Sequence, residues 1–95
     1  MTEEDKLKLL KIDLMISQEN DLYDLYLKQL LSSSLEFLQT QGMTYKADST
    51  ADAQIQVSYA AFLFRQRNNQ EQSVPQWLRR LINNRIFSEK AGDIS

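Results

Sequence analysis

Hydrophobic residues recur at helical spacing in four separate stretches of the chain. Leu7, Leu10 and Leu14 follow three acidic residues, which the positive end of a helix dipole favours, and predict a helix over residues 3–12. The second stretch, residues 21–39, has a broad apolar stripe that is typical of a helix with neighbours on two sides. A short helix followed by a long one is therefore expected.

The third and fourth helices are predicted from their starts. The third begins at Ser49, with Asp52 three residues later in a variant of the capping box. The fourth covers residues 75–87. Either Ser73 caps this helix, or Pro75 is its first helical residue, where the missing N–H of proline does no harm. Its apolar positions are expected to close the core and are Trp77, Leu78, Leu81, Ile82 and Ile86.

These elements predict an all-α domain, a small bundle of about four helices. Two long central helices should pack antiparallel or crossed, with shorter helices at the N- and C-terminal ends. The 95 residues are enough for one domain, and the two glycines and one proline allow few tight turns. Gly42 is well placed to end the second helix, and residues 89–95 are expected to form a flexible tail.

Charge is distributed unevenly along the chain. Residues 1–48 carry five lysines and nine acidic residues, a net charge of −4, whereas residues 49–95 carry all five arginines, one lysine and four acidic residues, a net charge of +2. This asymmetry indicates a nucleic-acid face or two surfaces of opposite sign, unless the charges are merely solvated.

Several kinds of chemistry are excluded by composition. The chain has no cysteine and no histidine, which rules out disulfides, Cys/His zinc sites and catalysis by a Cys or His nucleophile. Its only glycines, Gly42 and Gly92, cannot form a phosphate-binding loop. We predict that the protein is not an enzyme and has no cofactor or metal. No signal-peptide pattern or membrane span is recognisable, so we expect a soluble intracellular protein.

The basic fourth helix leaves two functional alternatives open. Its "RRLINNR" run contains arginine and asparagine, which read base edges in the major groove, so a small helical DNA-binding regulator using the 75–87 helix is one alternative. The acidic overall charge and the long polar loop before this helix argue against that reading. Arginine is also enriched in protein interfaces, which favours a protein-binding role.

The order of these elements resembles the all-helical head–tail connector (adaptor, or head-completion) proteins of long-tailed bacteriophages. The resemblance covers residues 5–88, and no single motif in it is diagnostic. One departure is Leu14-Met15-Ile16, where many members of the family have a glycine. The stretches that carry the resemblance are, in order, "LKLLKIDLMI", "ENDLYDLYLKQLLSSSLEFL", "DAQIQVSYAAFLFRQRNN" and "VPQWLRRLINNRIF".

The resemblance implies a structural virion protein at the head–tail interface, present in the host cytoplasm during assembly. Such proteins form a homo-oligomeric ring of about a dozen subunits below the portal protein, extend the DNA channel and support a stopper or tail-completion protein. Viral DNA passes through without specific binding, and no cofactor or membrane is involved. By position, residues 87–95 would lie near the portal and residues 42–48 toward the next component.

From the residues and the resemblance together, we expect a set of side chains to contact neighbouring subunits or partner proteins. The arginines of this set could instead be simply solvated, and Trp77 is expected in the core rather than in an interface. The candidate contact residues are Arg65, Arg67, Arg79, Arg80, Arg85, Phe87, Ile94 and Tyr45.

Overall fold

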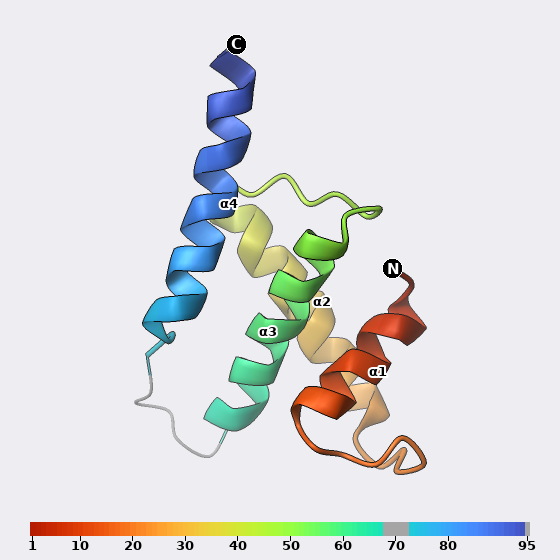
Figure 1. Ribbon diagram of the computed structural model, residues 1–95. Helices are drawn as coiled ribbons and strands as arrows, with labels where there is room; N and C mark the ends of the chain where they lie inside the picture. The colour runs from red at the N-terminus through yellow and green to blue at the C-terminus, as the bar shows by residue number, and fades with distance from the viewer. Residues whose placement is uncertain (68–72, 95) are drawn as a thin grey trace.

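The computed structural model describes residues 1–67 and 73–94, with the side chains of residues 90–94 left out of the description. The described residues form helices and connecting loops without any strand, which confirms the all-α prediction and the four helices (Figure 1). The helices are α1 (Glu3–Asp13), α2 (Asp24–Thr40), α3 (Thr50–Gln66) and α4 (Gln76–Ile94).

Side chains cap the N-termini of two of the helices. In α1, the Thr2 hydroxyl accepts from the Asp5 N–H and the Asp5 carboxylate accepts from the Thr2 N–H, which completes a capping box. In α3, the Ser49 hydroxyl accepts from the Asp52 N–H, as the sequence predicts. The N-cap of α2, Tyr23, has no side-chain cap, and this helix starts three residues later than predicted.

The fourth helix differs most from its prediction. Pro75 lies just before the first helical residue, and its carbonyl accepts from the N–H groups of Leu78 and Arg79. The helix continues through residue 94, so most of the predicted 89–95 tail is helical, and at 19 residues α4 is longer than α2 or α3. The flexibility of this segment stays a prediction, and Ser95 lies outside the described residues.

Two apolar clusters hold the helices together, and α3 contributes to both. Small residues on one face of α3 let α1 and α2 approach it closely, whereas the opposite face of α3 packs against the end of α2, the loop that follows it and α4. The first cluster contains Leu7, Leu10, Leu27, Leu31, Val57, Ala60, Ala61 and Phe64. The second contains Leu38, Met43, Ile55, Tyr59, Phe62, Leu78 and Ile82.

Helix α4 lies beside α3 and extends past the rest of the bundle at its C-terminal end (Figure 1). The molecule is correspondingly elongated, measuring 47 × 31 × 18 Å. Leu78 and Ile82 are buried as predicted, but Trp77 and Leu81 are 59% and 41% exposed, so their assignment to the core is wrong. Only a narrow side of α4 is covered, because α3 is its main neighbour, and residues one position away from that side face solvent.

Candidate interaction surface

The covered side of α4 carries an ion-pair network centred on Arg85. The Arg85 guanidinium donates through Nε to Asp52 Oδ1 at 2.6 Å and through Nη2 to Asp52 Oδ2 at 3.1 Å. Nη2 also donates to the Thr44 carbonyl at 3.0 Å, and Nη1 donates to Glu89 Oε2 at 3.4 Å. Glu89 in turn accepts from the Thr44 N–H at 3.0 Å. This network joins α4 to α3 and to the loop between α2 and α3.

Asp52 is fully buried at the first turn of α3. Burial alone would raise the pKa of its carboxyl group, but hydrogen bonds from Arg85 and from the Lys46 N–H outweigh burial and lower that pKa. The same contact raises the pKa of the Arg85 guanidinium. The pair is therefore fully charged at neutral pH, and Arg85 already uses its donors within the chain.

Tyr45, another predicted contact residue, is half-buried and takes part in a second internal network. Its hydroxyl donates to Gln56 Oε1 at 2.6 Å, and the buried Gln56 amide donates to the Leu31 carbonyl at 2.8 Å. The ammonium group of Lys6 lies 5.0 Å from the centre of the Tyr45 ring, a cation–π contact. Tyr45 thereby links α1, the connector and α3, which gives it a structural role.

Two of the predicted contact arginines lie at the C-terminal end of α3 and have partners within the chain. Arg65 Nη2 donates to the Asp13 carbonyl at 2.9 Å and to Asp13 Oδ1 at 3.0 Å, which joins α3 to the end of α1. The guanidinium of Arg67 lies 3.7 Å from the ring centre of Phe64 and donates to the Phe64 carbonyl at 2.8 Å. Both side chains keep an exposed surface, but each has an internal partner.

Three other predicted contact residues of α4, Arg79, Arg80 and Phe87, are exposed. Arg79 and Arg80 are exposed and form no ion pair with any residue that the structure describes. Phe87 is 74% exposed. The side chain of Ile94 lies outside the described part of the chain.

The exposed side of α4 bears a continuous stripe of residues at helical spacing. We call Trp77, Arg80, Leu81, Asn84 and Phe87 the outer stripe; all five are exposed. Their spacing of three or four positions places them on one face of the helix. The segment 76–88 contains three arginines and no acidic residue. Because Arg85 binds Asp52, the available positive charge on this segment comes from Arg79 and Arg80.

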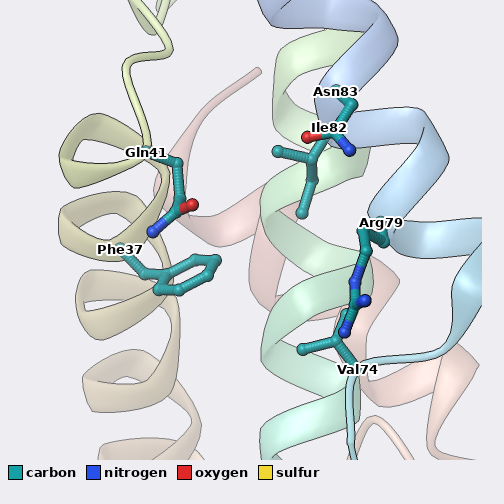
Figure 2. A pocket seen from close by; sticks show the side chains of 6 residues that line it. All are labelled: Phe37, Gln41, Val74, Arg79, Ile82 and Asn83. Atoms are coloured by element: carbon teal, nitrogen blue, oxygen red, sulfur yellow. The ribbon is translucent and has the colours of Figure 1, made fainter.

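Arg79 lies apart from the outer stripe, beside an open groove between α2 and α4. Figure 2 shows Phe37 and Gln41 on the α2 side of this groove, facing residues of α4 and the segment before it. The groove has a volume of about 270 Å³. Its lining residues are Phe37, Gln41, Val74, Arg79, Ile82 and Asn83.

A second exposed apolar surface lies where α1 is joined to α2. We call residues 12–26 the acidic corner, because the segment has four acidic residues and no lysine or arginine. Its exposed large hydrophobic side chains include Met15, which is 92% exposed and has a positive φ of 59°. The hydrophobic side chains exposed in this corner are Ile12, Met15, Leu22, Leu25 and Tyr26.

Lys11 joins the end of α1 to the start of α2 and to the loop between them in the acidic corner. Its ammonium group is 2.6 Å from Asp24 Oδ1 and donates to the carbonyls of Gln18 at 3.3 Å and Asn20 at 3.0 Å. The Lys11 side chain is only 4% exposed, so its charge is used internally. The sequence pattern does not reveal this surface, because Leu22 and Tyr26 belong to the apolar stripe that predicts α2.

Comparison of the chain with protein-family models, curated proteins and solved structures finds no match. Among the described residues, no helix has an apolar run long enough to cross a membrane, and no group of three acidic side chains is arranged to hold a metal ion.

Proposed function

We propose that this chain is a structural assembly protein, a head–tail connector of a long-tailed bacteriophage that forms a ring below the portal. Its role would be to extend the DNA channel and to support the stopper or tail-completion protein. The resemblance in sequence supports the phage assignment, and the all-α fold agrees with what that resemblance implies.

One structural observation carries the assembly role. In the described part of the chain, all eight large hydrophobic side chains that are exposed lie either in the acidic corner or on α4. Exposed apolar side chains that are concentrated in this way mark interaction surfaces, because scattered single residues are the normal pattern. Two such surfaces suit a subunit that has neighbours on both sides.

A DNA-binding regulator is the second candidate, and the exposed Arg79, Arg80, Asn83 and Asn84 favour it. The internal contacts of Arg85 weaken this candidate, because they remove one of three arginines from the helix that would read DNA. Phosphate binding usually requires a broad positive surface, and the net charge of −2 argues against one on this chain.

The test is native mass spectrometry at high protein concentration, with and without the portal protein encoded by the same genome. A closed ring, or a portal complex of matching stoichiometry, is the expected result. A chain that stays monomeric or dimeric and ignores the portal would contradict the proposal. Duplex-DNA binding measured over a salt series is the parallel experiment, since the regulator predicts a steep loss of affinity with salt.

A further inference from the structure

We infer that the outer stripe of α4 binds the acidic corner of a second copy of this chain, in a head-to-tail contact. The inference rests on the proposed assembly role and names the two surfaces that carry it out. The two surfaces are separate regions of the fold: α4 stands on one side of the bundle, and the junction of α1 and α2 lies on the other (Figure 1).

Charge complementarity identifies the occupant. Glu19 and Asp21 are exposed in the acidic corner and form no ion pair with a described residue. Arg80 is exposed on the outer stripe and is likewise unpaired among the described residues. Each surface therefore offers free charge of the sign that the other lacks, and each also carries exposed hydrophobic side chains.

The same charges disfavour a two-fold contact. An interface of the stripe with itself would bring Arg80 toward the Arg80 of the other copy, and a corner–corner interface would bring Glu19 and Asp21 toward their own copies. Like charges that face each other at an interface oppose association. A contact between two different patches is heterologous, and it generates a ring when its rotation closes.

The apolar residues have a suitable form for such a contact. Trp77, Leu81 and Phe87 follow one face of α4, the 19-residue helix at the side of the bundle. The corner presents Met15 just after the end of α1 and Leu25 in the first turn of α2. A helix face with apolar anchors at this spacing, docked against an apolar surface, is a common mode of recognition.

The experiment uses two full-length variants that each lose one surface. The stripe variant carries Arg80→Asp with Phe87→Asp, and the corner variant carries Met15→Asp with Leu25→Asp. All four side chains are exposed, so circular dichroism should show wild-type helicity. The aspartates make both altered surfaces more negatively charged, so the two surfaces repel each other and cannot form a new contact.

Each variant alone should be monomeric by native mass spectrometry and sedimentation, whereas the wild-type chain assembles. An equimolar mixture should give a 1:1 heterodimer and nothing larger, because only the intact corner of one variant and the intact stripe of the other can pair. Either variant assembling like the wild type overturns the inference, and so does a mixture in which both variants stay monomeric.

Other occupants of the stripe give different results. If the stripe variant loses portal or duplex-DNA binding but self-associates like the wild type, the stripe serves that partner and the inference is overturned. A wild-type chain that stays monomeric up to about 1 mM also overturns it. If that monomer still binds the portal, the proposed function survives without this contact; if it ignores the portal, both fail.

Discussion

Arg85 of α4 binds both carboxylate oxygens of Asp52 in α3, a residue 33 positions earlier in the chain. Asp52 is fully buried, and the Arg85 side chain is 18% exposed. The pair joins the helix that bears the outer stripe to the rest of the bundle, so it sets where that stripe lies. Its remaining acceptors and donors contact Lys46, Thr44 and Glu89.

Replacing Arg85 should therefore cost stability. Arg85→Ala leaves the Asp52 carboxylate buried without its charged partner, and removal of one member of a buried pair costs about 3–5 kcal/mol. Arg85→Lys should retain part of the stability, because an ammonium group cannot bind both carboxylate oxygens side by side. Urea denaturation measures the loss. The matched control is Arg80→Ala, which should leave the free energy of unfolding within about 0.5 kcal/mol of wild type, since Arg80 is exposed.

The same pair predicts a dependence of stability on pH. The pKa of Asp52 is lower in the folded chain than in the unfolded chain, because hydrogen bonds from Arg85 and the Lys46 N–H outweigh the opposing effect of burial. The stabilisation is thus fully present above the unfolded pKa and is lost as the pH falls through the folded pKa. The difference in unfolding free energy between wild type and Asp52→Asn should narrow as the solution is made acidic.

Thermal unfolding at a series of pH values between neutral and strongly acidic would measure this difference. In the Arg85→Ala background, the Asp52→Asn change should show a weaker pH dependence, since the main hydrogen bonds that lower the Asp52 pKa are gone. An equal pH dependence in both backgrounds would show that Arg85 does not control the titration of Asp52.

Much of the fold follows from local patterns in the sequence. Helical spacing of apolar residues predicts all four helices, and the residue pattern predicts Ser49 as the cap of α3. The sequence does not predict the end of α4, because residues past Phe87 lack an apolar pattern. What supports the helix there is tertiary: the Glu89 carboxylate accepts from the Thr44 N–H, 45 positions away in the chain. A contact between residues so far apart in the chain cannot be inferred from the pattern of neighbouring residues.

The candidate site was less predictable than the fold. Asp52 is recognisable in sequence as part of a capping box, yet its carboxylate binds Arg85 and the Lys46 N–H. Trp77 has the spacing of a core residue, but its face of α4 is left uncovered. In both cases the local pattern is correct, and the outcome depends on how α4 crosses α3, which sequence spacing does not specify.

Tyr45 provides a test of the second internal network. Tyr45→Phe removes the hydroxyl that donates to Gln56 Oε1 and leaves that buried amide oxygen without this partner. The expected loss is about 1–3 kcal/mol of unfolding free energy, the cost of an unsatisfied buried polar group. Tyr26→Phe is the matched control, because the Tyr26 side chain is exposed, and it should unfold at the wild-type midpoint. Equal midpoints for the two variants would mean that the Tyr45 hydroxyl contributes nothing to the network.

Replacing the two exposed arginines of α4 one at a time tests whether self-association uses the outer stripe or the groove. Arg79 and Arg80 are neighbours in sequence with equal charge, but Arg79 lines the groove beside Phe37, whereas Arg80 lies on the stripe between Trp77 and Asn84. Arg80→Glu should weaken self-association at least tenfold, because it places a negative charge opposite the acidic corner. Arg79→Glu should change it less than threefold. Both variants should keep wild-type helicity and melting temperature.

Sedimentation equilibrium at low and at moderate salt distinguishes the two positions. The wild-type association should weaken as salt screens the attraction between the charges. The association of Arg80→Glu should depend less on salt, or should strengthen as salt is added. Adding Asp21→Arg to Arg80→Glu should restore part of the lost affinity, since the two substitutions exchange the signs of the paired surfaces. If Arg79→Glu is the more damaging change, the contact runs over the groove between α2 and α4 and the stripe is not its centre.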